Sequence, residues 1–136
     1  MSSEENLTPT YIYKLVPSFP PPYPLPDRLP VSALDEKDQF LHLSTSKQVS
    51  RTLKLYFKDE TKVYVLRISY DHVVKDIRWE DSKNGAPGAV GGEGIFPHLY
   101  NGLKLGRDVV ESVQEWENGD GQWDEALKKA EGWLIY

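Results

Sequence analysis

Hydrophobic and polar residues follow one another in short alternating or clustered stretches, a pattern that predicts an α+β chain with more strand than helix. The clearest stretch is 62–70, where Tyr64, Leu66, Ile68 and Tyr70 share one face of an extended segment. This alternation predicts a half-buried strand. Further extended segments are expected at 11–16, 40–43, 77–80, 95–100 and 109–116.

Helical spacing first appears after the second of these strands. Thr45 and Gln48 have the spacing of a capping box, and Val49, Leu53 and Tyr56 recur on one helical face behind them. A helix is therefore predicted to follow Thr45 directly. Shorter helices or turns are expected near 32–35 and over 124–131.

The remaining segments read as loops around one domain that spans 10–136. Residues 1–9 resemble a solvated tail, and seven prolines between 17 and 30 predict an extended, polyproline-like surface loop. Such a loop could bind a protein partner, but a surface insertion is the favoured interpretation. The glycine-rich segment 81–94 matches no phosphate-binding fingerprint, so a flexible loop is expected there.

Composition narrows the classes of function. The chain has 136 residues, 27% of them charged, and a formal net charge of −5, which argues against a nucleic-acid-binding surface. It contains no cysteine, as is typical of a reducing compartment. Neither a leader nor a membrane-spanning stretch is visible in the sequence, so a soluble, cytoplasmic protein without a membrane partner is expected.

Two of the three histidines lie inside apolar segments and are the first candidates for chemistry. His42 is followed two residues later by Ser44, and His98 by Tyr100, so each pair projects from one side of a strand. An imidazole with a pKa near neutrality can donate, accept or bind a ligand, and a neighbouring hydroxyl can orient it. A buried histidine that only satisfies backbone groups is the alternative for each, whereas His72 is expected to be exposed and inert.

The predicted strand-to-helix unit adds a candidate anion site. It would place Ser44 and Thr45 at a helix N-terminus, where exposed N–H groups favour negative charge. A pyrophosphate pocket is a plausible use of this arrangement.

Five motifs in order closely resemble domain-of-unknown-function family 952 (DUF952). They are Ile12-Tyr13-Lys14, Ser32-Ala33-Leu34-Asp35, Phe40-Leu41-His42-Leu43-Ser44-Thr45, Arg78-Trp79-Glu80 and Phe96-Pro97-His98-Leu99-Tyr100. This family is thought to resemble the ADP-ribosyltransferase fold. The resemblance implies a twisted, mainly antiparallel split sheet with flanking helices, no required cofactor, and NAD as a nucleotide substrate.

The resemblance also implies a cleft, with Tyr13 and Lys14 on its first strand and Glu80 or His98 near the reacting ribose. On the residues alone, three functions stay open: transfer at an NAD-type riboside, two-histidine phosphoesterase chemistry, and a non-catalytic nucleotide- or protein-binding module. No metal site is predicted, because His42, His98 and Glu80 lack the local spacing of known sites. The predicted catalytic residues are His42, Glu80 and His98, and the predicted binding residues are Tyr13, Lys14, Ser44, Thr45 and Tyr100.

Overall fold

A computed structural model describes the chain except for residues 1–7, 18–20, 23, 84 and 120–121. In chain order its strands are β1 (Tyr11–Pro17), β2 (Leu41–His42), β3 (Lys62–Ser69), β4 (Ile77–Asp81), β5 (Ile95–Leu99) and β6 (Val110–Glu117). Its helices are α1 (Ala33–Asp38), α2 (Val49–Tyr56), α3 (Tyr70–Val73), a 3₁₀ turn (Val74–Asp76) and α4 (Asp124–Lys129). The predicted strands are all present, and each lies within two residues of its expected bounds.

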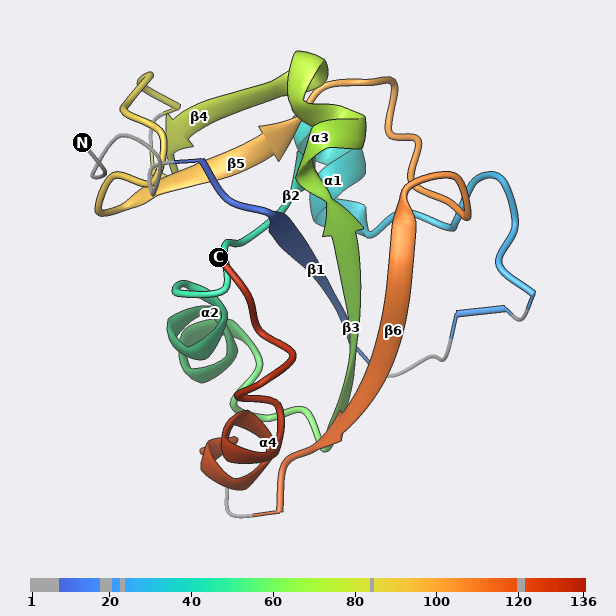
Figure 1. The fold of residues 1–136 in the computed structure, drawn as a ribbon, viewed down its shortest axis with the longest axis vertical. Coiled ribbons are helices and arrows are strands. Elements are labelled where there is room, and N and C mark those ends of the chain that lie inside the picture. Colours follow the sequence, from blue (N-terminus) through green and yellow to red (C-terminus); the bar gives the residue numbers. More distant parts are fainter. Residues whose placement is uncertain (1–7, 18–20, 23, 84, 120–121) are drawn as a thin grey trace.

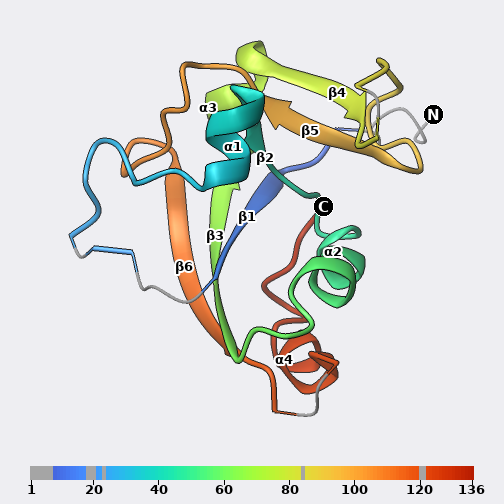
Figure 2. The ribbon, with the colours of Figure 1, turned by 180° about the vertical axis from the view of Figure 1, so that it is seen from behind.

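The strands form two antiparallel sheets of three, ordered β1-β3-β6 and β2-β5-β4. Backbone hydrogen bonds between Tyr13 and Ser44, with N···O distances of 2.7 and 2.9 Å, join the two sheets. Figures 1 and 2 show β4 and β5 crossing one end of the first sheet, while α2 and α4 lie one above the other along one side of that sheet. The predicted α+β class with antiparallel sheets and a few helices is confirmed.

The central strand β3 is buried on both faces, so the prediction of a half-buried strand is wrong. Tyr64, Leu66 and Ile68 face one hydrophobic cluster, and Val63 and Val65 face another. The alternation along β3 assigns its residues to the correct faces. Because β3 pairs with β1 on one side and with β6 on the other, it lies in the middle of the sheet, where helices cover its second face. A sheet covered on both faces needs hydrophobic residues at successive positions of its central strand.

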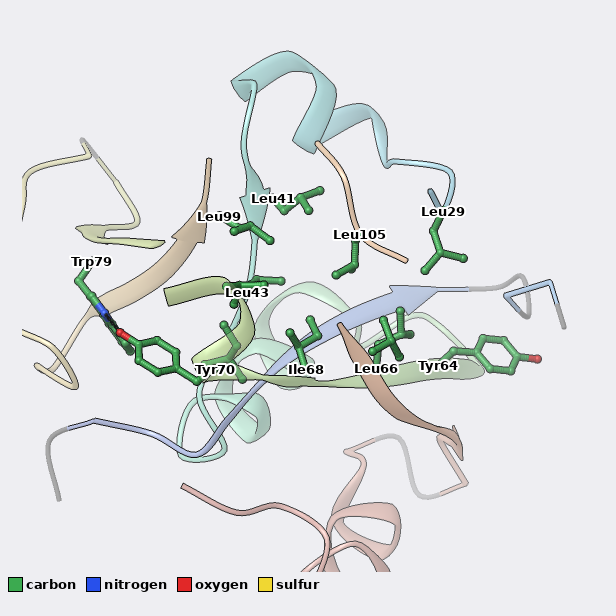
Figure 3. Close-up of a cluster of buried hydrophobic side chains, with 13 residues drawn as sticks. Leu29, Leu41, Leu43, Tyr64, Leu66, Ile68, Tyr70, Trp79, Leu99 and Leu105 are labelled. Carbon is green, nitrogen blue, oxygen red and sulfur yellow. Dashed lines mark hydrogen bonds between the residues drawn. The ribbon is translucent and has the colours of Figure 1, made fainter. Parts of the chain in front are cut away.

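The larger hydrophobic cluster fills the space between the two sheets (Figure 3). Leu66 and Ile68 of β3 meet Leu41 of β2, Leu99 of β5 and Trp79 of β4 there. The second cluster packs α2 and α4 against the opposite face of the first sheet. One sheet therefore contributes to both cores, and the second sheet completes only the first of them.

The helix after β2 starts later than the capping box predicts. The Gln48 side-chain oxygen accepts a hydrogen bond from the Thr45 N–H at 3.0 Å, which is one half of the box, but α2 begins only at Val49. The predicted turn at 71–72 is part of the short helix α3, and His72 is exposed as expected. The helix predicted over 124–131 ends at Lys129.

Both predicted loops are partly tied to the core. Pro17 is the last residue of β1, and the Leu29 side chain is buried, so the proline-rich segment is not a surface insertion throughout. At the start of the glycine-rich segment, Asp81 belongs to β4 and Pro87 forms a bridge with Glu80. These contacts order the first part of a loop that was expected to be flexible. Most of the predicted N-terminal tail lies outside the described residues, and so do residues 18–20 and 23 of the predicted proline-rich loop.

Among the described residues, no helix has the length and apolar character needed to cross a membrane.

Candidate functional site

The candidate site lies on the second sheet. The face of this sheet that points away from the core carries side chains that can take part in chemistry. In its register, His98 of β5 lies directly opposite His42 of β2 on one side and Arg78 of β4 on the other. Residues directly opposite in antiparallel strands share a face, so two imidazoles and a guanidinium form one row across the sheet. The two imidazole centroids are 5.4 Å apart. The two histidine segments of the sequence thus meet in one place.

His98 is almost fully buried and is oriented by a carboxylate. Its Nδ1 lies 2.8 Å from Glu80 Oε1, and the Tyr100 hydroxyl donates to the same oxygen at 2.6 Å. Burial lowers the pKa of His98, and the charge of His42 lowers it further, although the Glu80 hydrogen bond acts in the opposite direction. A neutral His98 that donates through Nδ1 keeps a lone pair on Nε2, for which the described residues provide no partner.

Glu80 is the acceptor of this cluster. Burial alone would raise its pKa, but the hydrogen bonds from Tyr100 and His98 outweigh burial and hold the pKa of Glu80 below its usual range. Burial and the same hydrogen bond raise the pKa of Tyr100 to about 12, so its hydroxyl stays protonated and donates. Glu80 is therefore an ionised carboxylate. It fixes the side chains of His98 in β5 and of Tyr100, which directly follows β5.

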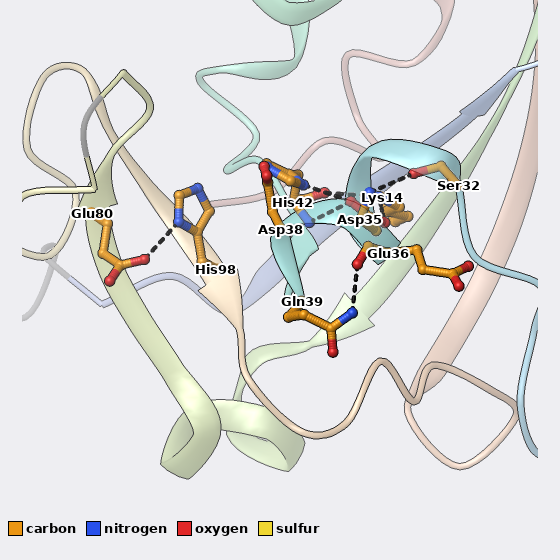
Figure 4. Close-up of polar contacts among 9 residues, drawn as sticks. All are labelled: Lys14, Ser32, Asp35, Glu36, Asp38, Gln39, His42, Glu80 and His98. Carbon is orange, nitrogen blue, oxygen red and sulfur yellow. Dashed lines mark hydrogen bonds and ion pairs between the residues drawn. The ribbon is translucent and has the colours of Figure 1, made fainter.

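His42 is held between two aspartates of α1 (Figure 4). Its Nδ1 lies 2.6 Å from Asp35 Oδ1, and its Nε2 lies 3.0 Å from Asp38 Oδ2. Carboxylate oxygens only accept, so a doubly protonated ring would satisfy both of them. The sheet thus places an imidazole flanked by two carboxylates beside one that contacts a single carboxylate.

Asp35 connects His42 to a buried lysine. The Lys14 ammonium contacts Asp35 Oδ2 and donates to the His42 carbonyl at 3.2 Å, while the His42 N–H donates to Asp35 Oδ1 at 3.2 Å. Burial lowers the pKa of Lys14 although Asp35 opposes it. Burial alone would raise the pKa of Asp35, but His42 and Lys14 together hold it below its usual range. An ion pair of this kind fixes the backbone of β2 at the point where His42 emerges.

Aromatic rings cover the histidine row. The Phe40 ring stacks on His98 at a centroid distance of 4.3 Å and lies 4.5 Å from His42 and 4.9 Å from Tyr100. The Arg78 guanidinium lies 4.3 Å from the centroid of the Tyr100 ring. An exposed cation and partly exposed rings at one rim are suited to a ligand that has both a flat group and a negative charge.

Three predicted binding residues lie outside this cluster. Tyr13 points to the opposite face of the first sheet, where its hydroxyl donates to the Trp133 carbonyl at 3.1 Å and accepts from the Ile135 N–H at 2.8 Å. Ser44 is buried with its Oγ 3.3 Å from Thr52 Oγ1, and Thr45 is buried as well. The prediction that one cleft gathers all eight residues is wrong, because Tyr13 alternates away from Lys14 and α2 begins four residues beyond Thr45.

The sequence interpretation missed Asp38 altogether and gave no role to Asp35 or Phe40. Asp38 and His42 are four residues apart, but no helix connects them, so this spacing carried no recognisable signal. Asp35 precedes His42 by seven residues and is separated from it by a turn, so their contact could not be inferred from spacing. Phe40 was expected only to be part of a strand. Among the described residues, no group of three or more histidine, aspartate or glutamate side chains is arranged to hold a metal ion.

The chain belongs to a family of proteins of unknown function, DUF952, whose family model matches residues 26–113. This match confirms the family suggested by the motifs. No curated protein matches the chain.

Solved structures of one other protein are similar to most of this chain. The crystal structure of protein CC0527 from Caulobacter crescentus has a TM-score of 0.61 and 26% sequence identity, covering 88% of this chain and 99% of that chain. The solution NMR structure of CC0527 has a TM-score of 0.58 at 26% identity and covers 82% of this chain and 90% of that chain. The similarity therefore extends beyond the matched family region to most of the chain.

Proposed function

We propose that the histidine row is the active site of a two-histidine phosphoesterase that acts on a small nucleotide. The observation that carries this proposal is the single row formed by His42, His98 and Arg78 across β2, β5 and β4. Phosphodiester cleavage needs a base, an acid and a cation around one phosphoryl group. Two imidazoles and a guanidinium in one row support this combination.

His98 is the general base in this scheme. Its Nδ1–H is committed to Glu80, so Nε2 would accept a proton from the attacking water. As the water oxygen forms its bond to phosphorus, His42 releases its Nε2–H from Asp38 and donates that proton to the oxygen that leaves, and the bond between phosphorus and that oxygen breaks. Arg78 would balance the charge that gathers on the phosphoryl oxygens. Phe40 offers a ring on which a base could stack.

Hydrolysis of 2′,3′-cyclic nucleotides by the full chain tests this proposal. His98→Gln keeps a polar side chain but removes the titrating ring, so it should reduce kcat by a factor of about 10² or more. His72→Gln is the matched control, because His72 is exposed and outside the row, and it should retain full activity. Arg78→Met should raise KM more than it lowers kcat if its main role is to bind the phosphate. Absence of hydrolysis by the unaltered chain would contradict the proposal.

A second candidate is an NAD-binding, ADP-ribosyltransferase-like activity, and one observation favours it. Both hydrogen bonds to Glu80 fall on Oε1, which leaves Oε2 available among the described residues for a ribose hydroxyl or a developing oxocarbenium ion. Release of nicotinamide from NAD, followed by chromatography, distinguishes the two functions. Under this second function, Glu80→Gln should reduce nicotinamide release at least about tenfold with little change in NAD affinity, since the carboxylate acts in the transition state.

A further inference from the structure

A cavity of about 260 Å³ lies on the other side of Asp35 from the histidine row. Its walls are mainly aliphatic and include Leu29, Leu41, Leu66 and Leu105, which all belong to the larger hydrophobic cluster. Protein interiors contain few voids larger than one water molecule, whose share of liquid volume is about 30 Å³. A hollow of this size beside a packed core is large enough for a small organic molecule. Neither His42 nor His98 lines it.

Two charged residues, Lys14 and Asp35, reach this cavity, and they are paired with each other. The side chain of Lys14 is 12% exposed and that of Asp35 is 1% exposed, so the pair is largely removed from water. An ammonium has three N–H groups, and two acceptors, Asp35 and the His42 carbonyl, meet that of Lys14 among the described residues. The Lys14 ammonium therefore has one N–H more than it has acceptors among these residues.

We propose that this cavity is a binding site for a small, uncharged aliphatic molecule that carries one hydrogen-bond acceptor, such as a cyclic ketone. The aliphatic walls would bury its ring, and the remaining Lys14 N–H would donate to its oxygen. An anionic ligand would compete with Asp35 and bring a surplus charge among aliphatic side chains, and a cationic ligand would meet Lys14. The internal neutrality of the Lys14–Asp35 pair thus selects an uncharged ligand.

A ligand bound in the cavity should change the environment of the histidine row, because Asp35 both lines the cavity and contacts His42. Its Oδ2 contacts Lys14, and its Oδ1 accepts from the backbone N–H and the ring of His42. A ligand that draws Lys14 towards itself would alter the contacts of Asp35 with His42. The backbone amide of His42 is therefore an internal reporter, and binding can be measured whether or not the row is catalytic.

Two-dimensional NMR of the ¹⁵N-labelled full chain tests the site with three probes of matched six-carbon rings. They are cyclohexanone, cyclohexanecarboxylate and cyclohexylammonium at millimolar concentration. Cyclohexanone should shift the amide signals of Lys14, Val31, Leu105 and His42 in a saturable way, and the two charged probes should bind at least about tenfold more weakly, a difference of 1.4 kcal/mol. Equal binding of all three probes would overturn the proposed ligand class.

A cavity-filling variant locates the binding. Val31 is partly buried at the cavity wall, so Val31→Phe should abolish the cyclohexanone shifts, and Val31→Leu should weaken binding to a smaller degree while disturbing the fold less. Leu55→Phe in α2 is the control, because Leu55 is exposed and does not line the cavity, and this variant should bind as the unaltered chain does. The proposal is overturned if cyclohexanone shifts no cavity signal, or if both Val31 variants fold and bind it normally.

Discussion

At the scale of single residues, Asp35 determines how the candidate site is built. Its carboxylate is 1% exposed and is surrounded by the Lys14 ammonium and by the backbone N–H and ring of His42. A buried carboxylate is stable only when such partners compensate the loss of water. Asp35 therefore sets the position of β2, the orientation of the His42 ring and the charge state of the cavity behind them.

Asp35→Asn should lower the free energy of unfolding by about 3 kcal/mol, because it leaves the Lys14 ammonium buried without its counter-charge. Urea unfolding followed by circular dichroism measures this loss. Glu36→Gln is the matched control, since Glu36 is the next residue of α1 and is exposed, and it should change stability by less than about 0.5 kcal/mol. Equal midpoints for both variants would show that the Lys14–Asp35 pair contributes nothing to stability.

His98 should make stability depend on pH in a predictable direction. Burial lowers its pKa in the folded chain, so the unfolded chain binds the proton more readily as the pH falls below about 6.5. Folding stability should therefore decrease from pH 7 to pH 5, by at most about 1.4 kcal/mol per pH unit from this one residue. His98→Gln should flatten the dependence over this range, whereas His72→Gln should leave it unchanged. Parallel stability curves for His98→Gln and the unaltered chain would contradict a buried, neutral His98.

The residues that sequence reasoning found are those with a local pattern. His42 and His98 stood out because each interrupts an apolar strand and precedes a hydroxyl residue by two positions. Asp35, Asp38 and Phe40 could not be assigned, since their partners meet them only after α1 folds back on β2 and β2 pairs with β5. The prediction for Tyr13 is wrong for a related reason. The alternation along β1 shows which residues share a face, but which of the two faces points toward the histidines depends on the whole sheet.

At the scale of elements, the strands were predictable and their surroundings were not. Alternation along β3 gave both of its faces correctly, but burial on the second face depends on α2 and α4, which are distant in sequence. The proline-rich segment was similarly read from composition alone. Composition does not reveal that the Leu29 N–H donates to the Leu105 carbonyl at 2.7 Å, a contact that attaches this segment to the loop before β6.

Gly106 tests how tightly that attachment is made. A Cβ atom at this position would lie 1.9 Å from the Asp27 carbonyl oxygen and 2.6 Å from that of Pro26, and neither backbone group can rotate away. Gly106→Ala should therefore separate the two loops and cost about 1–3 kcal/mol of stability, measured by thermal unfolding. Gly119→Ala is the control, because a Cβ atom there meets no atom within 4 Å. An unchanged melting temperature for Gly106→Ala would show that the two loops are not held together in solution.

At the scale of the whole molecule, the two sheets are joined by a shared core. Leu66 and Ile68 of β3 pack in the same cluster as Leu41 and Leu99 of the second sheet. No two neighbours in the order β1-β3-β6 are consecutive in the chain, and in the order β2-β5-β4 only β4 and β5 are, so local patterns do not specify most of these pairings. The split-sheet prediction instead came from the family resemblance, which carries information about long-range pairing that the residue pattern lacks.

The shared core predicts that the two sheets unfold together. Leu99 is fully buried in β5 and belongs to the cluster between the sheets, so Leu99→Ala should cost about 2–5 kcal/mol through lost burial and the cavity it leaves. Urea titration followed by amide NMR signals can observe β3 and β4–β5 separately. Because a cooperative transition has one midpoint for all probes, both sets of signals should move to lower urea by the same amount. Val113→Ala, at an exposed position of β6, should move neither set appreciably. Loss of the β4–β5 signals before those of β3 would show instead that the sheet carrying His42, His98 and Arg78 opens on its own.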